Sequence, residues 1–171
     1  MTVLSTKNNS KRAEVQETWT SGPPIQASFY TKLSSIIQIT LSPAERFSCH
    51  IFGSHHHKEI LEWMENYSKG EKSEELPLDF TKLTPFTLKG LLAIKTIPLG
   101  RCASYGEIAA LAGQEKGARA IGNVCNKNPF PLVIPCHRVI QGNGSLGGFA
   151  YPIEMKQSLL DFESQSASSS F

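Results

Sequence analysis

The chain has 171 residues, 40% of them hydrophobic, which is enough for one ordinary domain or two small ones with an apolar core. Residues 1–80 carry 8 Lys and Arg against 10 Asp and Glu, whereas residues 81–171 carry 9 against 5, so the basic character lies in the second half. No apolar run has the length of a membrane-spanning helix, and the first residues lack the basic-then-apolar order of a secretory signal. We therefore expect no membrane partner and a cytoplasmic protein, or a nuclear one in a eukaryote.

The first half predicts a small α/β domain. Residues 1–25 are polar and without a clear period, and we expect a flexible tail there. Short β-branched stretches broken by turns over residues 27–53 predict antiparallel strands, and the apolar spacing over residues 55–70 predicts an amphipathic helix that ends at a glycine. A charged linker follows, so this domain is predicted to span residues 26–80.

The second half is predicted to be mostly helical, over residues 81–163. A first helix fits residues 85–97, between a proline and a Pro/Gly stop. Ser104 and Glu107 have the spacing of a capping box at the start of a short helix, and another helix fits residues 115–128. Two short helices joined by a tight turn indicate a helix-turn-helix, although paired helices are common in small helical domains. A last helix fits residues 153–163, and the serine-rich residues 164–171 predict a disordered tail.

The cysteines and histidines give two contrasting signals. The four cysteines form no C-x-x-C pair, which argues against a disulfide framework or a zinc site. The run His55-His56-His57 is more often solvent-exposed than metal-bound, so we expect no metal. Cys136 differs, because it follows an apolar run and precedes His137 and Arg138, two groups that favour a thiolate. Cys136 is therefore the candidate nucleophile.

The motifs together resemble those of the O6-alkylguanine-DNA alkyltransferases. The resemblance runs from about Pro85 to Glu163 and rests on the stretches "SYGEIAALAG", "ARAIGN" and "NPFPLVIPCHRVI". It implies an α+β protein with a ribonuclease-H-like N-terminal domain and a helical domain carrying the helix-turn-helix. It also implies a monomer that moves an alkyl group, mainly methyl, from O6 of guanine in double-stranded DNA to Cys136. The transfer is irreversible, inactivates the protein after one turnover and needs no cofactor.

The resemblance assigns roles to residues around the thiol. His137 is expected to act as the base through a water, and Glu163 to hold its imidazole in the useful tautomer. Tyr105 is expected to bond the guanine ring as it leaves, and Asn128 to support the turn that carries Cys136.

The resemblance also assigns a DNA-binding surface. Arg119 is expected to enter the base stack in place of the extruded nucleotide, from a helix that lies in the minor groove. Small side chains beside Arg119 allow a close approach, and two lysines flank the helix; these residues are Ala118, Ala120, Gly122, Lys116 and Lys127.

One part of the predicted substrate pocket departs from the family. The pocket is expected to involve Pro131, Val139, Phe149, Ala150 and Tyr151. The family commonly has Tyr-x-Gly-Gly where this chain has Phe149-Ala150-Tyr151-Pro152, so we expect a bulkier wall and a narrower range of alkyl groups.

Two other classes of function stay open from the residues alone. A lesion-binding protein without catalysis would resemble the alkyltransferase-like proteins, but those lack the cysteine. A cysteine hydrolase would use Cys136 and His137 repeatedly, and it would leave Arg119 on the predicted helix-turn-helix without a role.

Overall fold

The computed structural model describes residues 14–168, and the chain divides into two compact units between Asp79 and Phe80. The division lies next to the boundary predicted at residue 80. No helix among residues 14–168 is long and apolar enough to cross a membrane.

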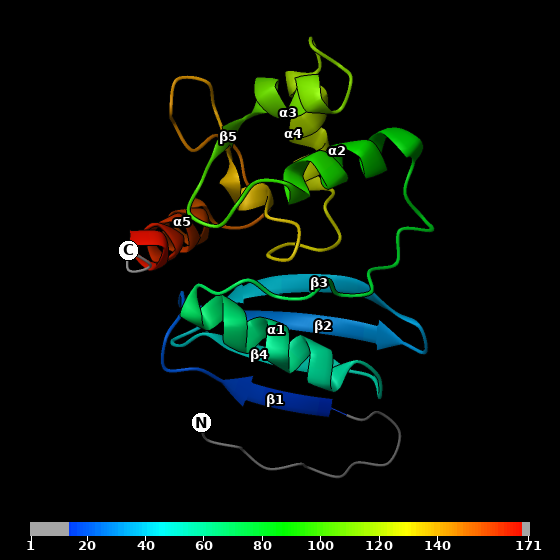
Figure 1. Cartoon of the computed structure of the whole chain (residues 1–171), viewed down its shortest axis with the longest axis vertical. Coiled ribbons are helices and arrows are strands. Elements are labelled where there is room, and N and C mark those ends of the chain that lie inside the picture. The colour runs from blue at the N-terminus through cyan, green and yellow to red at the C-terminus, as the bar shows by residue number, and fades with distance from the viewer. Residues whose placement is uncertain (1–13, 169–171) are drawn as a thin grey trace. The chain divides into compact units, whose positions relative to one another are not determined.

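The N-terminal unit is a four-stranded sheet with one helix lying across it (Figure 1). The strand order is β1-β4-β2-β3, and the elements are β1 (Glu14–Thr18), β2 (Ile25–Lys32), β3 (Ser35–Pro43), β4 (Ser48–Phe52) and α1 (His57–Lys69). The core forms between the sheet and α1, because Ala27 and Phe29 of β2 and Ile60 and Met64 of α1 are all fully buried. Burial of these side chains is the main favourable contribution to folding of this unit.

The sheet is mixed, so the prediction of antiparallel strands was wrong in one pairing. β2 and β3 form the expected antiparallel hairpin, but β4 pairs with β2 in parallel. The chain crosses from β3 to the far side of β2 over residues 44–47 before it enters β4. Alternating apolar residues report a half-buried strand, but they carry no information about strand direction.

The prediction of a flexible tail over residues 1–25 was also wrong where the structure describes it. Residues 14–18 form β1, which pairs antiparallel with β4, and Trp19 and Ile25 are buried. β1 is an edge strand with polar residues on its open face, which is why its sequence looks like a tail. Residues 1–13 lie outside the described residues.

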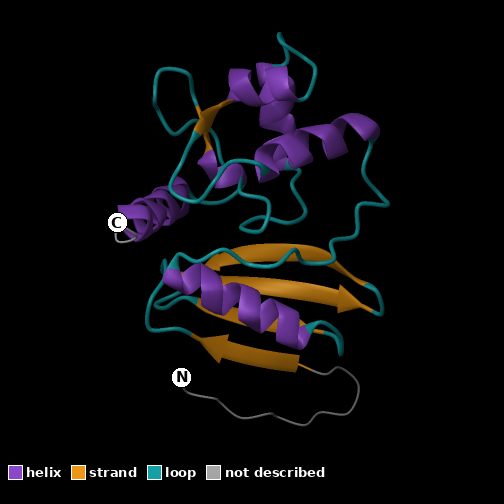
Figure 2. Ribbon diagram, viewed as in Figure 1, coloured by secondary structure: helices purple, strands orange, loops and turns teal. Residues whose placement is uncertain are grey.

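The C-terminal unit is mostly helical, with a two-stranded parallel ladder of β5 and β6 (Figure 2). Its elements are α2 (Pro85–Lys95), β5 (Ala103–Ser104), α3 (Tyr105–Leu111), α4 (Ala118–Asn126), the 3-10 helix η1 (Cys136–Arg138), β6 (Val139–Ile140) and α5 (Ile153–Ser168). α2, α3 and α4 pack against one another, and α5 contacts η1. Sheet and helices segregate along the chain, as predicted for an α+β protein.

Helix α5 is longer than predicted, and the disordered tail expected from residue 164 is wrong up to Ser168. In these added turns the serine hydroxyls donate to backbone carbonyls four residues earlier: Ser166 to Phe162 at 3.0 Å and Ser168 to Ser164 at 2.9 Å. This last turn also packs on Gly100, where an added Cβ would lie 2.5 Å from that of Ala167. Residues 169–171 lie outside the described residues.

Candidate active site

A tight turn presents Cys136. Asn128 holds this turn at both ends, because its Nδ2 donates to the carbonyl of Ile134 at 2.9 Å and its Oδ1 accepts from the backbone N–H of Phe130 at 2.9 Å. Between them Leu132 adopts a left-handed backbone, φ 72°, which is uncommon for a bulky side chain. The two hydrogen bonds fit the supporting role expected of Asn128.

Cys136 starts the 3-10 helix η1, so the segment is not extended at the thiol. The thiol is buried, and burial raises its pKa above the ordinary value. The side chain of Asn128, the ammonium of Lys156 and the backbone N–H groups of Cys136 and His137 act in the opposite direction and favour the thiolate. The resting group is therefore a thiol, and it needs a base before it can attack.

The predicted base lies in a buried charge network. His137 Nε2 is 2.7 Å from Glu163 Oε1, and Glu163 also accepts from Arg138 Nε at 2.7 Å and Nη2 at 3.0 Å. Arg138 Nη1 donates to the carbonyl of Ile97 at 2.7 Å. His137 and Glu163 are 0% exposed, so these bonds form away from water. The structure thus brings His137 and Glu163 together, as the resemblance implied.

The network fixes the protonation of His137. Burial alone would raise the pKa of the Glu163 carboxyl, but the hydrogen bonds from His137 and Arg138 and the positive charge of Arg138 outweigh it and hold that pKa well below its usual range. Burial lowers the pKa of His137, so its imidazole is neutral near pH 7. A neutral imidazole facing a carboxylate carries its proton on Nε2, which leaves Nδ1 as an acceptor. Nδ1 is buried and has no hydrogen-bond partner among the described residues.

Sequence reasoning missed Lys156, which lies in the predicted last helix and was given no role. Its side chain is fully buried, and Nζ donates to the carbonyls of Val139 at 2.7 Å, Leu146 at 2.5 Å and Gly148 at 3.3 Å. Burial lowers the pKa of the ammonium, and the thiols of Cys125 and Cys136 oppose that shift when they ionise. Nothing in the sequence marks this lysine as buried, because the same helix also carries Glu154, Gln157 and Asp161, and lysines are expected at the surface.

The glycine loop after β6 closes over Tyr105. The Tyr105 hydroxyl donates to the carbonyl of Gly148 at 3.2 Å, and burial together with the nearby thiols raises its pKa to about 12. Gly147 has φ 70°, and a Cβ there would lie 3.0 Å from the Tyr105 ring, so this position requires glycine. Phe149 follows, with its ring 5.6 Å from that of Tyr151. Tyr105 therefore stays protonated at neutral pH and is available as a donor.

The other predicted pocket residues are divided by their exposure. Pro131 and Val139 are buried beside the Cys136 turn, Phe149 and Tyr151 are partly exposed, and Ala150 is exposed. The structure thus places Pro131 in the turn that carries Cys136 and Val139 in β6. The other three residues lie in the segment that follows the glycine loop.

The predicted helix-turn-helix consists of α3 and α4, which pack together. The capping box at the start of α3 is confirmed: Ser104 Oγ accepts from the backbone N–H of Glu107 at 3.2 Å, and Glu107 Oε2 accepts from that of Ser104 at 2.7 Å. Arg119 lies in the first turn of α4, is exposed, and has no ion-pair partner among residues 14–168. Ala118, Lys116 and Lys127 are also exposed, whereas Ala120 and Gly122 are partly covered.

No group of three His, Cys, Asp or Glu residues in the described part of the chain is arranged to hold a metal ion. Two of the clustered histidines use their ring nitrogens locally, since His57 Nε2 bonds the carbonyl of Gly53 at 2.7 Å and His55 Nδ1 bonds Ser54 Oγ at 3.1 Å. The absence of a metal site stays a prediction.

Comparison with known proteins decides the family. Residues 85–165 match the family model described as "6-O-methylguanine DNA methyltransferase, DNA binding domain". A probable methylated-DNA–protein-cysteine methyltransferase of Acanthamoeba polyphaga mimivirus is 40% identical over 107 residues, which are 62% of this chain and 71% of the relative. The chain belongs to the methylated-DNA–protein-cysteine methyltransferase family.

Further members of the family agree with this assignment. The methyltransferase of Methanosarcina acetivorans is 40% identical over 107 residues, 62% of this chain and 68% of that protein. The solved structure of Mycobacterium tuberculosis OGT in complex with DNA has a TM-score of 0.66 and 28% identity, and covers 83% of this chain and 93% of that one. The fold is therefore that of a family member, from the N-terminal sheet to α5.

Proposed function

We propose that this protein repairs O6-alkylguanine in double-stranded DNA by moving the alkyl group onto Cys136. The observation that carries the proposal is the buried, unpartnered Nδ1 of His137, whose tautomer is set by Glu163. A buried nitrogen acceptor without a partner is costly unless a water or a proton donor reaches it during function. Cys136 is the neighbouring residue and supplies such a proton.

The chemistry follows from these groups. Nδ1 of His137 takes the proton of the Cys136 thiol, directly or through one water, and the imidazolium that forms is stabilised by Glu163. The thiolate attacks the alkyl carbon, the bond between that carbon and O6 breaks, and its electron pair remains on the guanine. The Tyr105 hydroxyl gives up its bond to Gly148 and donates to the guanine ring, which reduces the charge on the leaving group.

The product is a thioether, and this explains why one molecule repairs one lesion. Sulfur in a thioether has no proton to lose and is a poor leaving group. Neither His137 nor Lys156 is free to act as a second nucleophile on the thioether, because His137 is engaged with Glu163 and Lys156 donates to three carbonyls. No cofactor takes part in any step of this scheme.

DNA binding is assigned to the surface of α4. Arg119 is exposed and has no ion-pair partner among residues 14–168, so its guanidinium can take the place of an extruded nucleotide. The exposed Lys116 and Lys127 lie at the two ends of α4 and are placed to contact phosphates. We propose that a monomer binds duplex DNA in this way, in the cytoplasm or, in a eukaryote, in the nucleus.

The test is the mass of the intact protein after incubation with duplex DNA containing O6-methylguanine. The wild type should gain one methyl group per molecule, on the peptide that contains Cys136, and Cys136→Ser should gain none while it still binds the lesion. Label on Cys49, Cys102 or Cys125 instead would refute the assignment. Repeated turnover without a mass gain would favour a cysteine hydrolase, and binding without transfer would favour a lesion-binding protein.

A further inference from the structure

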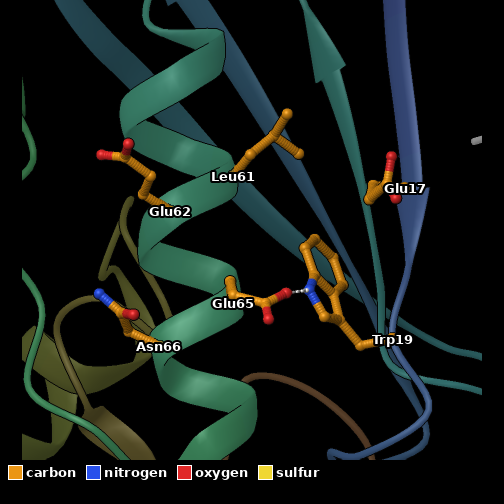
Figure 3. Close-up of a pocket in the computed structure, with 6 residues that line it drawn as sticks. All are labelled: Glu17, Trp19, Leu61, Glu62, Glu65 and Asn66. Atoms are coloured by element: carbon orange, nitrogen blue, oxygen red, sulfur yellow. Dashed lines mark hydrogen bonds between the residues drawn. The ribbon is translucent and has the colours of Figure 1, made fainter. Parts of the chain in front are cut away.

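The N-terminal unit contains a cavity that the proposed repair reaction does not use. Its volume is about 460 Å³, within the range of small-molecule sites. It lies between α1 and the β1 side of the sheet (Figure 3) and is lined by Glu17, Trp19, Leu61, Glu62, Glu65 and Asn66. Trp19 and Leu61 give it an apolar wall, and the remaining side chains are acidic or neutral.

One carboxyl group in this cavity, that of Glu17, has an oxygen without a hydrogen-bond partner among the described residues. Glu17 is only 7% exposed, and its Oε1 is buried without a hydrogen-bond partner in the described part of the chain. Glu65 differs, because it accepts from Trp19 Nε1 and pairs with Lys69 at 2.8 Å. The residue opposite Glu17 in the sheet is Cys49, a buried thiol that supplies no positive charge. Glu17 is thus a buried carboxyl group that pairs with no cation among these neighbours.

The lining selects the chemistry of a ligand. None of the described residues that line the cavity is basic, and the one lysine paired with a lining residue, Lys69, is bound to Glu65, so an anion near Glu17 would meet a carboxylate without a cation. A bare metal ion fits poorly, because the cavity is far larger than an ion and the described residues offer no cluster of three ligating side chains. An organic cation satisfies both parts of the wall: its charge pairs with a carboxylate, and its carbon chain contacts an indole and an isobutyl group.

We propose that this cavity binds a small organic amine, with its ammonium head on Glu17 and its alkyl chain against Trp19 and Leu61. Binding gives the buried oxygen of Glu17 the partner that it lacks among the described residues. The indole of Trp19 is held in place by its bond to Glu65 and by the ring of Phe47, 5.6 Å away, so the wall is formed before the ligand arrives.

Nuclear magnetic resonance of the full chain tests the proposal, because the indole N–H of Trp19 lies in the cavity wall. The sequence has two tryptophans, and Trp63, which stacks on Tyr67 and does not line the cavity, is the internal reference. The probes are pentylamine, 1-pentanol and pentanoate, which share a chain and differ in charge. Only pentylamine should shift the Trp19 resonance in a saturable way. Equal binding of pentanol, or no saturable shift with pentylamine, would overturn the proposal.

Two variants locate the charge. Glu17→Gln keeps the size of the side chain and should weaken pentylamine binding by about tenfold or more, as expected when a charge-assisted hydrogen bond is lost. Glu45→Gln removes the same charge from an exposed loop outside the cavity and should leave binding unchanged. Wild-type affinity in Glu17→Gln, or an equal loss in both variants, would show that the amine does not bind at Glu17. If Glu17→Gln fails to fold, the comparison of the three probes on the wild type still decides.

Discussion

Replacing Glu163 by Gln should destabilise the protein far more than an ordinary charge substitution does. The carboxylate accepts bonds from His137 Nε2, Arg138 Nε and Arg138 Nη2, all within 3.0 Å, and is 0% exposed. An amide has one oxygen, and its NH₂ would face one of these donors. The guanidinium of Arg138 would also lose its only carboxylate partner among the described residues. Breaking a buried ion pair in this way costs about 3–5 kcal/mol.

The pH dependence of this loss identifies its cause. The pKa of Glu163 is lowered in the fold, so its contribution to stability is complete above the unfolded pKa of about 4.3 and is lost as the pH falls through the folded pKa. The difference between wild type and Glu163→Gln should therefore be largest near pH 7 and shrink below about pH 4. Glu115→Gln, an exposed change of the same kind, serves as the control.

The assay is urea unfolding followed by far-ultraviolet circular dichroism at pH 7 and pH 3, in parallel with the rate of methyl transfer. Adding Arg138→Met to Glu163→Gln removes the stranded cation, so stability should largely return while the transfer rate stays low by about a hundredfold or more, because His137 keeps the wrong partner. A loss below about 1 kcal/mol in Glu163→Gln, a difference that does not shrink at pH 3, or a double variant that regains its rate would refute this reasoning.

Three further predictions concern the surface and the loop. Arg119→Ala should slow repair in duplex DNA much more than reaction with free O6-methylguanine, because extruding a base from the duplex costs a few kcal/mol and a free base needs no extrusion. Equal losses with both substrates would show that Arg119 does not replace the extruded nucleotide in the stack. Tyr151→Gly/Pro152→Gly should speed inactivation by O6-benzylguanine by about five- to a hundredfold while methyl transfer persists, since relief of overpacking is worth about 1–3 kcal/mol; no gain would mean that another group limits access. Lys156→Met should raise hydrogen exchange of the Gly147 and Gly148 amides and slow methyl transfer, and unchanged exchange would contradict the anchoring role of the ammonium.

The sequence predicted those parts of the molecule that local chemistry determines. The capping box at Ser104 and Glu107 and the stop of α1 at Gly70, with φ 71°, depend only on residues within one turn. β1 was not recognised because its partner strand lies more than thirty residues away, and pairing with β4 is what orders it. The parallel pairing of β2 and β4 was missed for the same reason, since direction depends on the path of the chain and not on the pattern of either strand.

The site shows the same division. Cys136 and His137 were recognisable as neighbours in an unusual local sequence, and Glu163 entered only through the resemblance, because nothing local marks a carboxylate near the end of a helix as buried. The role of Lys156 and the two hydrogen bonds from Arg138 to Glu163 were not predicted. Both depend on contacts between segments about 10 to 25 residues apart, and a basic residue in a sequence is expected at the surface unless its partner is known.

The placement of Glu163 and Lys156 on α5 has a consequence for the order in which the protein becomes reactive. Because α5 is synthesised after Cys136 and His137, a chain whose α5 has not yet docked has the thiol without the groups that set the tautomer of His137 and hold the loop over Tyr105. Its nucleophile is then no more reactive than an ordinary cysteine. The base that activates Cys136 and the loop over Tyr105 are therefore in place only after the last helix has docked, so the chain becomes able to act on a lesion at the end of its folding.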